Sequence, residues 1–167
     1  MKIKYIIISG YVAILFGRSR GTEDIDIFIE DIDRSLFYRF AENLQRRTLW
    51  IVNTSSKRLA YDMLHKGDAI RIAKKSTAIP NIEIKLAKTR EEKQILENPL
   101  KAAINKFGVC ISPIESQIAF KFWLGSEKDI EDAVYLYELF KDKLNKKLLK
   151  GKCKELNVLG RMKKYVK

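Results

Sequence analysis

Histidine, cysteine and long apolar runs are scarce in this sequence, and each scarcity excludes a class of protein. The 167 residues contain one histidine, His65, which excludes a cluster of histidine metal ligands. The two cysteines, Cys110 and Cys153, match neither a metal-ligand spacing nor a disulfide framework, and this indicates a reducing, cytoplasmic compartment. No apolar run approaches the roughly 20 residues needed to cross a bilayer, so we expect no membrane span.

Positive charge, by contrast, is abundant and unevenly placed. The formal net charge at pH 7 is +12, and the basic C-terminal segment, residues 141–167, holds eleven Lys or Arg against Asp142 and Glu155. Such a concentration favours a polyanionic partner, although a solvated tail that aids solubility is an equally open interpretation. The rest of the composition, 46% hydrophobic and 32% charged, is typical of a soluble globular chain of one domain, or of a compact core with a helical appendage.

Two aspartates lie two residues apart in a segment with strand periodicity, Asp24-Ile25-Asp26-Ile27-Phe28-Ile29. Side chains at i and i+2 of a strand point to the same face, so Asp24 and Asp26 face the same way, with Cα atoms roughly 6.5 Å apart. Carboxylates in this arrangement can bridge two divalent cations, for which Mg²⁺ is the expected metal and Mn²⁺ an alternative. Taken alone, the same alternation also fits an exposed strand of an antiparallel sheet.

A glycine turn and two arginines precede this strand. Ser9-Gly10 follows an apolar run and can turn the chain into a short helix over 11–16, with backbone N–H groups free at its start to attract phosphate. Arg18 and Arg20 then lie between that helix and the acidic strand. Guanidinium groups are always charged and bind phosphate oxygens bidentately. The region therefore predicts a combined phosphate and metal site.

A second alternating strand is expected over Ile82-Glu83-Ile84-Lys85-Leu86. It sends Glu83 and Lys85 to one face and the isoleucines to the other. Glu83 is the candidate for a third carboxylate of the site, and the alternative is a solvated glutamate paired with a cross-strand lysine. Lys85 can pair with Glu83 or contact a substrate phosphate.

These residues resemble the signature of the DNA-polymerase-β-type nucleotidyltransferase superfamily, and within it the minimal prokaryotic members typified by AbiEii-type toxin nucleotidyltransferases. That pattern is a Gly-Gly or Gly-Ser turn, a helix, an Arg-x-Thr-x-Asp-hydrophobic-Asp strand and a third acidic residue on a later strand. Arg20, Thr22, Asp24 and Asp26 match it in order and spacing, whereas the turn reads Ser9-Gly10, reversed from Gly-Ser.

The resemblance implies roles for individual residues. Asp24, Asp26 and Glu83 would be the catalytic carboxylates and would bind two Mg²⁺ ions, and Glu83 would help to deprotonate the attacking hydroxyl. Lys121 and the segment Lys128-Asp129-Ile-Glu-Asp132 match in residue type an inward lysine and an acidic helix beside the family's active site. Lys121 could neutralise the leaving pyrophosphate, or it could be an ordinary helix-surface charge. The expected nucleotide-binding residues are Ser9, Gly10, Arg18, Arg20, Thr22, Lys85, Lys121 and Asp129.

The implied reaction is transfer of a nucleoside monophosphate from a nucleoside triphosphate such as ATP to a hydroxyl, with release of pyrophosphate. RNA, in particular a tRNA end, is the favoured acceptor, and a protein hydroxyl or a small antibiotic are alternatives. The resemblance also allows the protein to be the toxin of a toxin–antitoxin pair, with an antitoxin protein as its partner. A different class of function stays open, a catalytically inactive protein of the same fold that binds nucleic acid through its lysines.

The expected fold is α/β, with a nucleotidyltransferase core at residues 1–88, made of a small mixed sheet flanked by helices, and a mainly helical C-terminal region at 89–167. Three helix starts are marked by caps: Asp31 or Asp33 before a helix over 35–45, Ser55 or Ser56 before one ended by Gly67, and Ser112-Pro113-Ile-Glu115 before a third. Other expected elements are strands at 49–52 and 69–73, a capped helix at 89–97, a hairpin of 101–104 with 109–111, a helix from Ser126, and basic helices broken near Gly151 and Gly160.

Overall fold

The computed structural model describes residues 2–104 and 106–166, which form two compact units, each containing chain segments that are distant in sequence. Unit 1 holds the described residues of Met1–Ile7 and Gly21–Glu97, and unit 2 holds those of Ile8–Arg20 and Asn98–Lys167. The division expected from the sequence, into a core at residues 1–88 and a helical region at residues 89–167, stays a prediction. No helix among the described residues is long and apolar enough to span a membrane.

Unit 1 is a mixed sheet with the strand order β3-β4-β5-β2-β1. Strands β2 and β5 are parallel neighbours, and the other adjacent pairs in this order are antiparallel. The strands are β1 (Tyr5–Ile7), β2 (Asp24–Ile29), β3 (Leu49–Ile51), β4 (Ile70–Lys74) and β5 (Asn81–Leu86). The predicted strands are therefore confirmed to within one or two residues at their ends.

Three helices complete unit 1: α2 (Arg34–Arg46), α3 (Lys57–Lys66) and α4 (Arg90–Glu97). Asp33, rather than Asp31, caps α2 by accepting the N–H of Leu36 at 2.8 Å, and Ser56, rather than Ser55, caps α3. Gly67 ends α3 in the left-handed conformation, as expected. The capping box at α4 is also confirmed, because Thr89 and Glu92 bond reciprocally to each other's backbone N–H.

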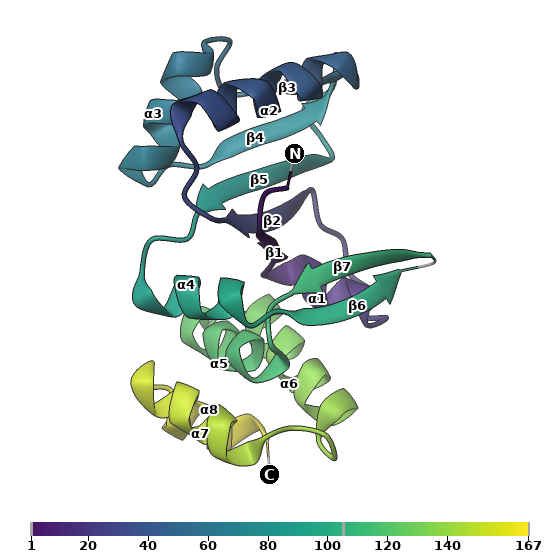
Figure 1. Ribbon diagram of the computed structural model, residues 1–167. Helices are drawn as coiled ribbons and strands as arrows, with labels where there is room; N and C mark the ends of the chain where they lie inside the picture. Colours follow the sequence, from purple (N-terminus) through teal and green to yellow (C-terminus); the bar gives the residue numbers. More distant parts are fainter. Residues whose placement is uncertain (1, 105, 167) are drawn as a thin grey trace. The chain divides into compact units, whose positions relative to one another are not determined.

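The core of unit 1 lies between the sheet and the helix pair α2 and α3, which cover one sheet face (Figure 1). The alternating isoleucines of the strands supply the sheet's side of this core, and Phe37, Leu44, Ala60 and Leu64 supply the helical side. Each isoleucine that points into the core forces its strand neighbour to the opposite face. The acidic residues of β2 and β5 are thereby placed away from the core.

Unit 2 is mainly helical and contains α1 (Gly10–Leu15), α5 (Ile114–Leu124), α6 (Glu127–Phe140), α7 (Lys146–Glu155) and α8 (Leu159–Tyr165). Helix α5 packs against α6, α7 and α8, and α1 packs against α6. The expected hairpin is present as β6 (Leu100–Ile104) and β7 (Phe107–Ile111). Cys110 and Cys153 are both free thiols, and burial raises the pKa of Cys153 to about 11.

Two expectations for unit 2 are wrong. Ser112 is not the cap of α5, because Pro113 occupies that position without a side-chain hydrogen bond, and Glu115 instead accepts the N–H of Asn145 at 2.8 Å. Gly151 and Gly160 do not break the basic helices, since both lie inside them, in α7 and α8. The chain bends at Asn157, which has a φ of 55°. The buried side chains of Leu149, Cys153 and Met162 stabilise these helices through tertiary packing despite the glycines.

Candidate active site

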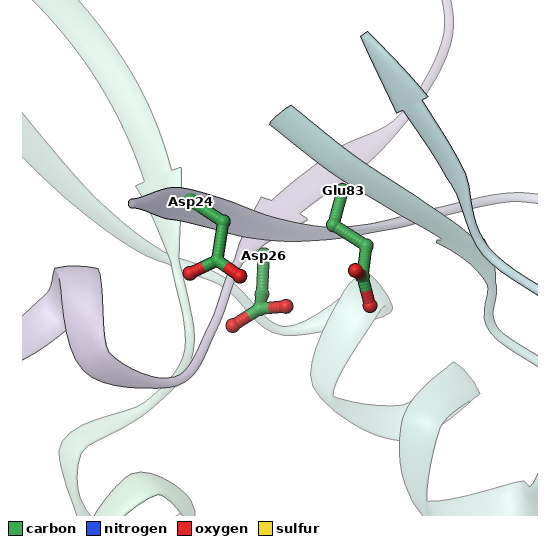
Figure 2. A group of neighbouring side chains, drawn as sticks. All are labelled: Asp24, Asp26 and Glu83. Atoms are coloured by element: carbon green, nitrogen blue, oxygen red, sulfur yellow. The ribbon is translucent and has the colours of Figure 1, made fainter. Parts of the chain in front are cut away.

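Three carboxylates meet on the face of the unit 1 sheet that lies opposite the core with α2 and α3. Asp24 and Asp26 project from β2, and Glu83 projects from β5 to the same side (Figure 2). Asp26 and Glu83 are direct partners in the parallel pairing of the two strands, so their side chains are neighbours on one face. One oxygen from each of the three residues lies within 4.8 Å of the others, and all three residues are half-buried. The structure therefore brings together the three carboxylates that the sequence singled out.

Thr22 orients the first of these carboxylates. Its hydroxyl lies 3.0 Å from the backbone oxygen of Asp24 and 3.2 Å from its Oδ1. A donor at the entrance of β2 fixes the direction in which the Asp24 carboxylate points. Thr22 thus lies at the site, in contact with a candidate metal ligand.

Glu83 is held by two cations. Arg71 Nε lies 3.1 Å from Glu83 Oε2, and Lys85 Nζ lies 2.9 Å from Oε1. Burial alone would raise the pKa of Glu83, but the hydrogen bonds from Lys85 and Arg71, together with their charges, hold the pKa below its ordinary value of 4.5. Glu83 thus belongs to the carboxylate cluster and is ion-paired as well. The predicted alternative, a solvated glutamate with a cross-strand lysine, is wrong, because the side chain is 12% exposed, Lys85 lies on the same strand and the cross-strand partner is Arg71.

The donor set fits a hard divalent cation. Carboxylate oxygens are the ligands that Mg²⁺ and Mn²⁺ prefer. Three carboxylates this close repel one another, and Arg71 and Lys85 offset this repulsion only in part, so a bound cation would stabilise the cluster further. Asn81, the register partner of Asp24, adds a further oxygen on this face. Its Oδ1 is buried and has no hydrogen-bond partner among the described residues. A bound cation, or a water molecule that coordinates it, would supply this missing partner. Asp24, Asp26 and Glu83 are therefore the residues that would hold the metal.

The turn predicted to bind phosphate lies in unit 2. Ser9 has a φ of 62°, an unusual conformation for a residue with a side chain, and it precedes α1. The buried Gln117 holds this turn, since its Nε2 donates to Ser9 O at 2.7 Å and its Oε1 accepts the Ser9 N–H at 3.3 Å. A side chain at Gly10 would require the Arg20 guanidinium to shift, because an added Cβ would lie 2.8 Å from Arg20 Nη1. The turn is thus tightly built, with the Arg20 guanidinium against it.

The two arginines predicted to bind phosphate converge on a buried aspartate. Asp132 of α6 is completely buried and is paired with both Arg18 and Arg20. Arg18 also pairs with the exposed Glu131 and donates to Lys128 O at 3.2 Å. The segment 18–20 is therefore fixed to α6 by ionised groups.

Lys121 joins the same cluster. Its side chain is only 2% exposed, and its Nζ lies 2.6 Å from Asp129 and 3.0 Å from Asp132. This burial excludes the alternative of an ordinary surface charge. Burial alone would raise the pKa of Asp129, but hydrogen bonds from Lys121 and Ser126, with the charges of Lys121 and Arg20, lower it.

The sequence analysis assigned no role to Gln117, Arg71 or Asn81, and it named Asp132 only as the last residue of the acidic segment that resembles the family's helix. For Asp132 a signal existed, because it falls on the apolar stripe of α6 with Ala133 and Leu136, and all three are buried. An ionised residue on a buried stripe requires partners, and Arg18, Arg20 and Lys121 supply them. No comparable signal marks Arg71 or Asn81, because their positions depend on strand order.

Comparison with known proteins gives one informative result. No protein-family model matches the sequence, and no curated protein matches it. Among solved structures, the chain is similar to the crystal structure of an antigenic nucleotidyltransferase-like protein from Paracoccidioides brasiliensis, with a TM-score of 0.53 and 18% sequence identity. The match covers 98% of this chain and 84% of that one. At this identity the similarity establishes the fold alone. The protein therefore has the mixed α/β fold of a nucleotidyltransferase-like protein.

Proposed function

We propose that the protein is a metal-dependent nucleotidyltransferase. It would transfer a nucleoside monophosphate from a nucleoside triphosphate to a hydroxyl acceptor. The observation that carries this proposal is the meeting of Asp24, Asp26 and Glu83 on neighbouring strands, with one oxygen of each within 4.8 Å of the others. The similarity of the fold to a nucleotidyltransferase-like protein supports it.

In this reaction the acceptor hydroxyl loses its proton, to Glu83 or to solvent water, and forms a bond to the α-phosphorus, while the bond from that phosphorus to the leaving pyrophosphate breaks. Mg²⁺, when bound, would supply the positive charge that stabilises the entering and leaving oxygens. Asp24 and Asp26 would hold it, and Thr22 would keep Asp24 in the ligating orientation. Glu83 would assist as a further metal ligand or as the acceptor of the hydroxyl proton.

The nucleotide-binding roles of the remaining residues stay predictions. In unit 2, Arg18, Arg20 and Lys121 all pair with Asp132, and the Arg20 guanidinium lies against Gly10 at the glycine turn. A guanidinium has five N–H donors and can serve Asp132 and a phosphate oxygen together. This feature supports the proposed use of Ser9, Gly10, Arg18, Arg20, Lys121 and Asp129 in binding a triphosphate such as ATP.

RNA is the proposed acceptor because of the basic C-terminal segment. Helices α7 and α8 present exposed lysines, namely Lys146, Lys147, Lys150, Lys154, Lys163 and Lys164. Cations of this density bind a phosphate backbone without regard to sequence. A tRNA end as acceptor, and a role as a toxin with an antitoxin partner, rest on the resemblance of the sequence to AbiEii-type proteins.

The test is incubation of the protein with each α-labelled nucleoside triphosphate, Mg²⁺ and total RNA. Label on a discrete RNA supports the proposal, and label on the protein itself supports nucleotidyl transfer with a protein acceptor. The absence of transfer from every triphosphate, with Mg²⁺ or Mn²⁺ and in the presence of RNA, contradicts the proposal.

The second candidate function is nucleic-acid binding without catalysis, which the basic C-terminal segment favours. A binding protein of this kind would show RNA affinity that falls steeply with salt and is independent of Mg²⁺ and of the three carboxylates. Nucleotide binding that requires Mg²⁺ and is lost in the Asp26→Asn variant distinguishes the enzyme from it.

A further inference from the structure

Arg71 occupies the strand beside the carboxylate cluster. In the antiparallel pairing of β4 with β5 it is the direct partner of Glu83, so both side chains lie on the same face of the sheet. Its Nε lies 3.1 Å from Glu83 Oε2. The Arg71 side chain is nevertheless 58% exposed, whereas that of Glu83 is 12% exposed. The guanidinium thus contacts the cluster with one edge and can present its other N–H groups to a ligand.

The charges around the cluster are partly balanced within the chain. Asp24, Asp26 and Glu83 contribute three negative charges when ionised, and Arg71 and Lys85 contribute two positive charges in contact with one of them. A fixed cation at a ligand carboxylate opposes a bare metal ion by Coulomb repulsion. The same cation attracts the anionic complex that a metal ion forms with a nucleoside triphosphate.

We infer that Arg71 is a specificity residue of the proposed nucleotidyltransferase site. It weakens the binding of a free divalent cation and strengthens the binding of a metal–nucleotide complex by contacting the triphosphate oxygens. The inference rests on the proposed function, since it requires that the three carboxylates hold a metal. Lys85 keeps Glu83 in place when Arg71 is removed, so the effect of Arg71 is one of charge and contact rather than of strand geometry.

This inference predicts that a single variant changes two affinities in opposite directions. In Arg71→Met the long side chain is kept and the charge is lost. Affinity for Mn²⁺ alone should rise, on the order of tenfold, because the repulsion is removed. Affinity for the complex of Mn²⁺ with a non-hydrolysable nucleoside triphosphate should fall, again on the order of tenfold, because a charge-assisted contact is lost. A merely structural role would move both affinities in the same direction.

The experiment titrates Mn²⁺ into the 167-residue chain, with and without the triphosphate analogue, and follows free Mn²⁺ by electron paramagnetic resonance. Arg71→Lys keeps the charge and should retain wild-type affinity for Mn²⁺ alone. The matched control is Arg34→Met, because Arg34 of α2 is similarly exposed, at 54%, and pairs with Asp62 rather than with the cluster. That variant should leave both affinities unchanged.

The inference is overturned if Arg71→Met leaves Mn²⁺ affinity unchanged or weakens it, or if affinity for the metal–nucleotide complex does not fall. A separate result identifies failure of the proposed function. If wild type and Asp26→Asn bind Mn²⁺ equally weakly, the carboxylates hold no metal, and both the proposed function and the role of Arg71 are refuted.

Discussion

Asp26 and Glu83 are direct partners across parallel strands, although they are far apart in the sequence. Parallel pairing of β2 with β5 places their carboxylates side by side, and the i, i+2 relationship on β2 adds Asp24 to the same face. The cluster is therefore built by the regular geometry of the sheet rather than by a loop, and this gives the proposed metal site a rigid base.

Asp132 should be a major determinant of the stability of unit 2. Replacing it with Ala leaves Arg18 and Arg20 without their buried partner and removes one of the two carboxylates that Lys121 contacts. We expect Asp132→Ala to lower the free energy of unfolding by about 3–5 kcal/mol in urea titrations at neutral pH. Glu131→Gln removes the exposed neighbouring contact to Arg18 and should cost at most about 1 kcal/mol. Equal losses in the two variants would contradict a central role for the buried cluster.

Asp129 should make the stability of the protein depend on pH in the acid range. Lys121 and Ser126 hold its folded-state pKa below the ordinary value of 3.8, despite the opposing effect of burial. The ionised carboxylate therefore stabilises the fold above that pH, and this contribution is lost as the pH falls through the folded-state pKa. In urea titrations, wild type should be more stable than Asp129→Asn at pH 7, and the difference should shrink below about pH 3.8. A difference that stays constant down to pH 2.5 would refute this linkage.

The glycines of the basic helices should be replaceable with a gain in stability. Gly151 lies inside α7, and an added Cβ would meet nothing within 4 Å. Gly151→Ala should therefore raise the free energy of unfolding by about 0.5–1 kcal/mol, because alanine loses less backbone freedom on folding.

Gly125 provides the opposite control. It ends α5 with a φ of 73°, and an added Cβ would displace the Arg161 guanidinium that contacts the carbonyls of Phe122 and Trp123. Gly125→Ala should cost at least about 1 kcal/mol, measured in the same urea titrations. For the Gly151→Ala variant, a loss of stability in these titrations would contradict the prediction and would show that the α7 backbone requires glycine at this position.

The sequence predicted local structure well where short-range chemistry decides it. Period-two alternation identified β2 and β5, and it correctly turned Asp24, Asp26 and Glu83 away from the isoleucine face. Side-chain caps located the start of α2, and an αL glycine located the end of α3, because both act within a few residues. The capping box at Ser112 failed because Glu115 is used by Asn145, thirty residues away.

The partnerships within each unit could not be predicted in the same way. That Arg71 and Lys85 both hold Glu83 depends on the order β4-β5-β2, and strand order is not encoded by any short segment. Residues 8–20 group with the C-terminal helices because Gln117 holds Ser9 and Asp132 holds the two arginines. The sequence indicated that residues 18–20 are charged, but it did not indicate that Asp132 of α6 is the partner of the two arginines.

The most direct test of the central claim is transfer of α-labelled nucleotide by carboxylate variants. Asp24→Asn and Asp26→Asn should each reduce the rate by about 10³-fold or more, because an amide cannot replace an anionic metal ligand. Asp68→Asn, which changes an exposed aspartate in the same unit, should transfer at the wild-type rate. Circular dichroism should show all three variants folded. Transfer at the wild-type rate by a folded protein that lacks both Asp24 and Asp26 would contradict the account.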